Sequence, residues 1–187
     1  MPRQTSRGLK LYEILLVALL PFLPCALGED VSCSASSHES YEYSCLISGE
    51  HNMTLYYTYS HGESIKIGIE AVSSGYVALG WTEIANEMIG SEAVMAWIDD
   101  DSVSSVKTYI LTSQSSSGIE EGGFEITNTS TTRTGDVLFA EWTRPLTSEE
   151  TASGNMLWAL CSETSKTRHD IGRGKLFDLH VPTNAHE

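Results

Sequence analysis

The feature that most constrains this chain is an alternation of apolar and polar side chains with a period of two residues. Isoleucine occupies every second position of residues 64–70, and a similar alternation runs through residues 54–59. Successive side chains of a β-strand point to opposite faces, so both segments are predicted as half-buried strands. Residues 75–81 are more continuously apolar and predict a central strand.

The same signals continue to the end of the chain. Further strands are predicted at residues 93–98, 106–111, 123–129, 137–143, 156–161 and 175–181. Turn signals separate them at residues 61–63, 73–75, 99–101, 115–118 and 133–135, and Gly-Arg-Gly at 172–174 is also interpreted as a turn. No segment has convincing helical periodicity. About nine or more short strands predict an all-β, antiparallel sandwich or barrel.

The first residues have the pattern of an export signal. Arg3, Arg7 and Lys10 precede a short apolar run at 14–22, and Ala26-Leu27-Gly28 supplies small residues for cleavage. Residues 1–28 are therefore predicted to be a secretory signal peptide, and the protein to be secreted. The formal net charge is −14, and it becomes −16 once three basic residues and one acidic residue leave with the signal.

The remaining chain divides into an N-terminal extension (29–51), a sandwich domain (52–181) and a C-terminal tail (182–187). No later stretch has membrane-spanning length, so the mature protein is not expected to insert into a membrane. Nucleic acid and anionic lipid both require clustered Lys and Arg, which this acidic chain lacks.

Cysteine usage fits an oxidising compartment. Cys25 lies in the predicted signal, which leaves Cys33, Cys45 and Cys161. A disulfide between Cys33 and Cys45 is the preferred pairing, and Cys45 with Cys161 is the alternative. Two sequons predict glycosylation in surface loops, at Asn52 and at Asn128.

The chain has no motif for hydrolysis or group transfer. A nucleophile elbow, a zinc-protease helix and a phosphate loop are all absent, and the six histidines are scattered. The acidic run at 99–101 is interpreted as a strand-ending turn in preference to a calcium site. The chain is therefore not expected to be a hydrolytic or group-transfer enzyme.

One part of the chain is more specific. Residues 75–81, Gly-Tyr-Val-Ala-Leu-Gly-Trp, are followed by Met-Ile-Gly-Ser-Glu-Ala-Val-Met-Ala-Trp at 88–97. Residues 139–146, 155–161 and 168–179 continue the likeness towards the C-terminus. This succession resembles the DOMON domain family, and its last segment resembles the haem-binding branch, which includes the cytochrome domain of cellobiose dehydrogenase and plant auxin-responsive apoplastic b-type cytochromes.

The resemblance implies an immunoglobulin-like sandwich that binds haem b through one Met and one His. The matching positions are Met88 and His169, and Arg173 is a candidate contact for a haem propionate. Such a domain passes electrons to a separate redox partner protein or a small-molecule carrier. The alternative is a carbohydrate-binding or adhesion module without haem, which would need exposed aromatic side chains.

The chemistry of Met88 and His169 supports their role as haem ligands, whereas the predicted order of strands argues against it. A thioether and a neutral imidazole saturate the iron and favour electron transfer over oxygen chemistry. A strict alternation of strands, however, places the Met88 loop and the His169 loop at opposite ends of the sandwich. An additional strand between Pro145 and Gly154 would bring them to one end. His180 is a second, weaker candidate ligand.

Overall fold

The computed structural model describes residues 33–60, 62–82, 87–113, 115–146, 155–164 and 172–176. Within these ranges the chain forms twelve β-strands and one 3₁₀ turn, η1 (Ser116–Gly118), without an α-helix. No helix in this part of the chain is long and apolar enough to cross a membrane. The predicted signal peptide at residues 1–28 lies outside the described residues.

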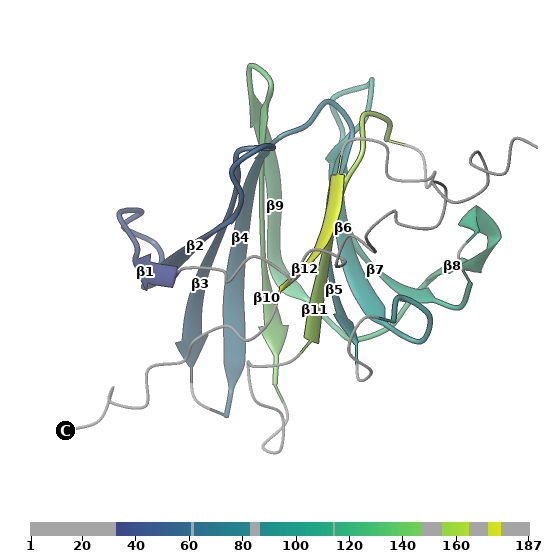
Figure 1. Ribbon diagram of the computed structural model, residues 1–187, viewed down its shortest axis with the longest axis horizontal. Coiled ribbons are helices and arrows are strands. Elements are labelled where there is room, and N and C mark those ends of the chain that lie inside the picture. The colour runs from purple at the N-terminus through teal and green to yellow at the C-terminus, as the bar shows by residue number, and fades with distance from the viewer. Residues whose placement is uncertain are drawn as a thin grey trace, which may run out of the picture.

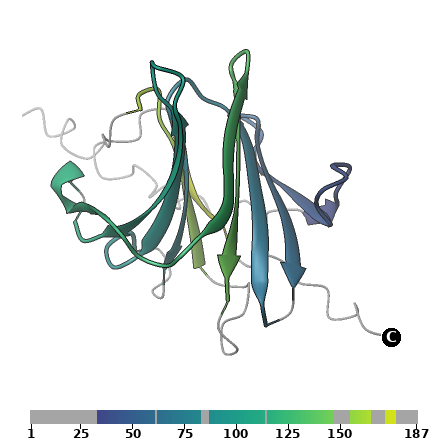
Figure 2. The same ribbon diagram turned by 180° about the vertical axis from the view of Figure 1, so that it is seen from behind.

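The strands form two six-stranded antiparallel sheets that face each other (Figures 1 and 2). The first sheet has the order β1 (Cys33–Ala35), β2 (Tyr43–Ser48), β3 (Met53–Ser60), β4 (Ser64–Val72), β10 (Val137–Pro145), β9 (Thr127–Thr134). The second has the order β12 (Gly172–Leu176), β11 (Asn155–Leu160), β5 (Tyr76–Thr82), β6 (Glu92–Ile98), β7 (Ser104–Leu111), β8 (Ile119–Glu121). The predicted all-β sandwich of nine or more strands is confirmed.

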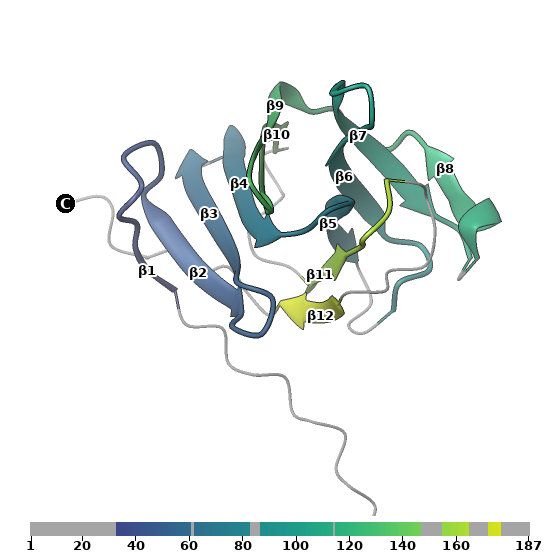
Figure 3. The same ribbon diagram turned by 90° about the horizontal axis from the view of Figure 1, so that it is seen from above.

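The core lies between the two sheets, as the view from above shows (Figure 3). In β4, Ile65, Ile67 and Ile69 are almost completely buried, and their polar neighbours face outwards. Val77 and Leu79 of β5 belong to the same cluster from the opposite sheet. The period-two pattern therefore identified the inward face of these strands correctly, because one face of each is removed from water.

The strand predicted at residues 123–129 is wrong in position, because β9 runs from Thr127 to Thr134. Gly122 and Gly123 have φ values of 137° and 117°, a backbone conformation that breaks a strand and favours glycine. The following threonine-rich segment forms the edge strand beside β10. Its β-branched side chains favour extended backbone although they show no apolar alternation.

Two further parts of the sheets were missed. The turn predicted at residues 172–174 is wrong, because these residues pair with β11 as part of β12. A ladder needs only backbone groups, so two glycines do not prevent pairing. Residues 33–48, predicted as an extension, supply β1 and β2 to the edge of the first sheet.

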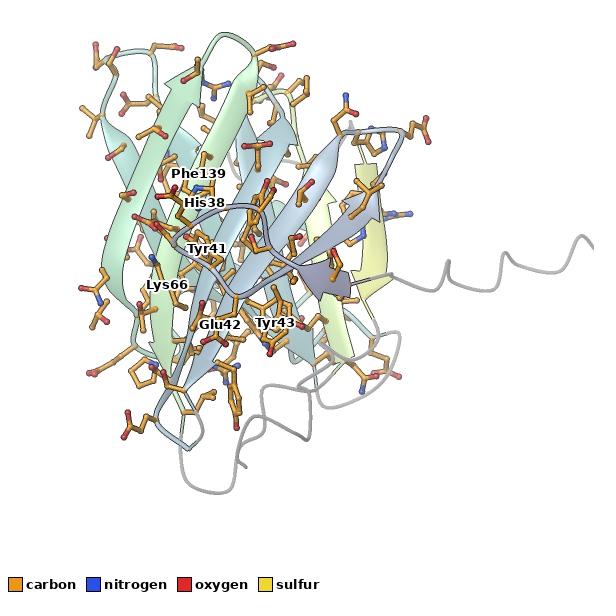
Figure 4. The ribbon with its side chains drawn as sticks, turned by 90° about the vertical axis from the view of Figure 1, so that its left-hand side faces the viewer. His38, Tyr41, Glu42, Tyr43, Lys66 and Phe139 are labelled. Atoms are coloured by element: carbon orange, nitrogen blue, oxygen red, sulfur yellow. A yellow bond between two sulfur atoms is a disulfide. The ribbon has the colours of Figure 1, made fainter. Side chains whose placement is uncertain are left out.

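The predicted disulfide between Cys33 and Cys45 is confirmed. The two cysteines lie directly opposite each other in the β1–β2 register, with Cα atoms 4.1 Å apart. The loop between them lies on the outward face of the first sheet, where Tyr41 donates a hydrogen bond of 2.8 Å to Glu141 (Figure 4). Tyr41 covers the backbone of Gly68, where a Cβ would lie 2.6 Å from the phenol oxygen.

Replacing both Cys33 and Cys45 with serine is expected to lower the free energy of unfolding by about 3 kcal/mol, because the disulfide restricts the unfolded chain. Urea denaturation monitored by tryptophan fluorescence measures the loss. Ser34→Ala with Ser44→Ala, in the same two strands, serves as the control and should change stability by less than about 0.5 kcal/mol. Equal stability of the disulfide variant and wild type would contradict the prediction.

Candidate functional site

A second apolar cluster lies on the outward face of the second sheet. Tyr76, Ala78, Met95, Tyr109 and Cys161 are buried there, in a group separate from the core between the sheets. They belong to the strand positions that alternate with the inward-facing ones. Among the described residues no strand or helix packs over this face. Because its side chains are apolar although they lie on the outward face of the sandwich, this face is the candidate functional site.

The centre of this face is made of small residues. Gly80 lies opposite Ala93 in the β5–β6 ladder, and Ala78 lies opposite Met95. A Cβ added at Gly80 would meet Glu92 O at 3.3 Å and the Ala93 Cβ at 3.5 Å, so a side chain there would require Glu92 O to shift by a few tenths of an ångström. These small residues lie among larger apolar ones, and we call them the glycine–alanine patch (Ala78, Gly80 and Ala93).

Charged residues border this apolar face. Lys107 lies opposite Met95 and Glu121 lies opposite Tyr109, and the two form an ion pair at 3.0 Å. Burial and, to a lesser extent, the carboxylate of Glu121 raise the pKa of Tyr109 to about 12. The phenol of Tyr109 is therefore neutral at neutral pH.

Met88 lies in the connection between β5 and β6. Its carbonyl oxygen accepts hydrogen bonds from the backbone N–H of Ser91, at 3.2 Å, and from the Ser91 hydroxyl. Gly90, with a φ of 85°, donates to Leu111 O at 2.7 Å and attaches this turn to β7. Met88 is half-buried and is held at the Thr82 end of β5.

His169 lies outside the described residues, in the connection between β11 and β12. The register places Thr82 opposite Asn155 and Val77 opposite Leu160. The Met88 connection and the His169 connection therefore leave opposite ends of the same sheet, as the alternation of strands predicted. β5 and β11 are neighbours in that sheet.

The beginning of the His169 connection is fixed by backbone contacts. Gly75 donates from its N–H to Cys161 O at 3.1 Å, and Cys161 donates to Tyr76 O at 3.1 Å. The Ser73 hydroxyl lies 2.9 Å from Cys161 O, and the Ser74 hydroxyl lies 2.9 Å from Ser162 O. Cys161, predicted to remain outside the disulfide, is buried at this junction.

Arg173, the predicted propionate contact, is an exposed residue of β12 opposite Ala159. Ala159 packs against the outward cluster, so Arg173 stands at the edge of the same face. The predicted glycosylation residues, Asn52 and Asn128, are both exposed. The acidic run ends β6 as predicted, because the Asp99 carboxylate accepts backbone N–H groups within its own turn, from Asp101 and Val103.

The sequence signal for the outward cluster was present but incomplete. Residues 75–81 were identified as continuously apolar, which is what a strand with two buried faces looks like. Which residues share the outward face follows only from the register. The four tryptophans do not form an exposed platform: Trp142 and Trp158 are buried, and Trp81 and Trp97 are half-buried. In the described ranges no group of three His, Cys, Asp or Glu could hold a metal ion.

Comparison with known proteins agrees with the fold. The cytochrome domain of cellobiose dehydrogenase from Myriococcum thermophilum superimposes with a TM-score of 0.56 at 11% sequence identity, over 78% of this chain and 86% of that one. No curated protein matches the sequence. The family model for the DOMON domain matches residues 49–162, which is more than half of the chain. The chain therefore belongs to the DOMON domain family.

Proposed function

We propose that this protein is a secreted electron-transfer module that binds haem b on the outward face of the second sheet, with Met88 and His169 as axial ligands. The observation that carries the proposal is the glycine–alanine patch. It is apolar and lies between the two ends of the sheet from which the connections with the ligand residues leave. The structural likeness to a cytochrome domain supports the same conclusion.

The opposite origins of the two connections are compatible with a shared iron. The β5–β11 ladder runs from Val77 to Thr82 and spans about 17 Å. Because Met88 is held at the Thr82 end, the His169 connection has to cover most of that length. An extended chain covers this distance in about five residues. His169 follows Leu160 by about nine residues, so the connection is long enough.

The residues of the face fit an apolar macrocycle with acidic substituents. When bound, a haem with Met and His ligation supplies a one-electron redox centre without an open coordination position. Tyr76 and Met95 would exclude water from its face, and the lack of a side chain at Gly80 would let its edge approach the sheet. Arg173 lies at the border of the face and would pair with a propionate. The sulfur of Met88 and the imidazole of His169 would provide the two ligand atoms.

The proposal includes secretion of the protein. A disulfide fits an oxidising compartment, and residues 1–28 would direct secretion. Electrons would pass to a separate partner protein or a small-molecule carrier. We propose no catalysis by this domain alone.

A visible spectrum of the purified protein with added haem tests the ligands. Wild type is expected to show the sharp reduced bands of a low-spin b-type cytochrome. Met88→Ala and His169→Ala should each lose them and bind haem about tenfold more weakly, because each leaves the iron with one protein ligand. His38→Ala, an exposed histidine of the first sheet, is the matched control and should retain the spectrum.

Two results would overturn the assignment. Low-spin bands retained in both ligand variants would exclude this ligand pair. Bands lost in His180→Ala but retained in His169→Ala would move the second ligand to His180. That outcome is physically reasonable, because β12 ends at Leu176, opposite Met156, at the end of the sheet where Met88 lies.

A further inference from the structure

A polar cleft lies at the end of the sandwich where β4 ends and β5 begins. Its volume is about 330 Å³, which is sufficient for a small molecule. The turn between β2 and β3 forms one wall, the turn between β9 and β10 forms the other, and the β4–β5 connection forms the floor. We call it the Asn52 cleft; its lining residues are Glu50, His51, Asn52, Val72, Ser73, Ser74 and Asp136.

The walls of the Asn52 cleft are attached to the folded core. Arg133 donates from its guanidinium to Ser74 O at 3.1 Å and to Gly75 O at 3.3 Å, and it also contacts Ser73 O. The N–H of Ser73 donates to Asp136 O at 3.1 Å, which joins the floor to one wall. His51 packs edge-on against the ring of Trp158, with centroids 6.0 Å apart. The cleft is thus a built feature of the fold.

One residue of the lining is itself the acceptor of a sequon. Asn52 begins Asn52-Met53-Thr54, is exposed, and has a φ of 46° in the tight turn between β2 and β3. Met53 is completely buried directly after it. The side-chain amide is therefore accessible to a modifying enzyme, and its position relative to the cleft is fixed by the next residue.

The second sequon offers a contrast. Asn128 also has a positive φ, 50°, and is exposed, but it lies in the edge strand β9 and not in the cleft lining. Its amide is 3.4 Å from the Thr143 hydroxyl on the outward face of the first sheet. A sugar attached there would extend from a sheet surface, whereas a sugar on Asn52 would begin at the edge of a cleft.

We propose that the Asn52 cleft binds the first N-acetylglucosamine of an N-linked glycan on Asn52. The attachment forms a bond between Asn52 Nδ2 and the sugar C1, with loss of one amide proton. The leaving group is the diphosphate of a lipid-diphosphate-linked oligosaccharide, the donor class for this reaction. The carboxylates of Glu50 and Asp136 would accept hydrogen bonds from sugar hydroxyls. The proposal rests on secretion but does not depend on haem binding.

Thermal unfolding of glycosylated and unglycosylated protein tests the cleft. Wild type, Thr54→Val and Ser130→Ala are each produced by secretion from a eukaryotic host and by refolding from a bacterial one. For each variant the Tm difference between the two products isolates the effect of the glycans from that of the substitution. Wild type and Ser130→Ala, which keep the Asn52 sequon, should gain about 3 °C when glycosylated. Thr54→Val should gain less than about 1 °C.

Two further measurements locate the effect. Trimming the glycan with an endoglycosidase that leaves one N-acetylglucosamine should preserve the Tm gain. Hydrogen exchange should slow at the amide of Ser73 in the glycosylated protein, because the sugar would cover the bond between Ser73 and Asp136.

Three results would overturn the proposal. The first is an intact mass that shows no glycan at Asn52 in the secreted protein. The second is an equal Tm gain in Thr54→Val. The third is a gain that disappears after trimming to one sugar. Absence of haem binding would leave all of these measurements unaffected, so failure of the electron-transfer function and failure of the Asn52 cleft are distinguishable.

Discussion

Replacing Gly75 with alanine is expected to lower the free energy of unfolding by about 3 kcal/mol, the upper range for overpacking. A Cβ at this position would lie 2.5 Å from Cys161 O and would also collide with the backbone N and O of Glu163. These are backbone atoms of a segment that is hydrogen-bonded to Gly75 itself, so no side-chain rotation can relieve the collision. The segment has to move, and its bonds to the β4–β5 connection have to break.

The measurement is urea denaturation, with Gly49→Ala as the matched control. Gly49 has no atom within 4 Å of its added Cβ, so this variant should be neutral or slightly more stable than wild type. If Gly75→Ala does not fold, Ser73→Ala provides a milder test, because it removes only the hydroxyl that contacts Cys161 O. A loss of about 1 kcal/mol is expected for that variant. If Gly75→Ala and Ser73→Ala were both as stable as wild type, the contact between the β4–β5 connection and Cys161 would not be tightly packed.

The architecture could be predicted from the sequence wherever one face of a strand is buried and the other is wet. The isoleucines of β4 are of this kind. The disulfide between Cys33 and Cys45 could also be predicted. In both cases the information is local, since a period of two or a short spacing between two cysteines suffices.

The rest depends on contacts between distant segments. β9 lacks an apolar alternation because it is an edge strand beside β10, and β12 contains two glycines because its backbone alone pairs with β11. Which outward residues gather into one cluster is decided by the register of β5 with β6 and with β11. A single-residue shift of the register would change every neighbour on that face. The glycine–alanine patch could therefore not be located before the register was known.

The candidate ligands Met88 and His169 show the same difference between what the sequence predicts and what only the structure shows. Met88 was found through family likeness, and the structure adds why it is held where it is: Ser91 and Gly90 fix its turn against β7. The alternation of strands had already placed the two loops at opposite ends. What it could not show is that both ends belong to neighbouring strands of one sheet, which makes the distance between them short enough for one connection to cover.

Replacing Gly80 with valine is expected to weaken haem binding about 100-fold while the sandwich stays folded. Gly80 belongs to the glycine–alanine patch, and the nearest atoms to an added Cβ are 3.3 to 3.9 Å away. Only the contact with Glu92 O is tight, and we expect a shift of a few tenths of an ångström to relieve it. A β-branched residue also suits a strand better than glycine does. The methyl groups would instead occupy the space that the haem edge requires, so haem affinity should fall while the Tm does not.

Haem titration followed by absorbance, together with thermal unfolding of the haem-free protein, separates the two effects. Thr132→Val is the control, because it replaces a hydroxyl with a methyl group on the exposed outward face of the first sheet, opposite Phe139. Its haem affinity should equal that of wild type. Gly80→Ala should lie between wild type and Gly80→Val, since one methyl group takes up less space than a valine side chain. Unchanged affinity in Gly80→Val, with the fold intact, would mean that haem binds elsewhere on the domain.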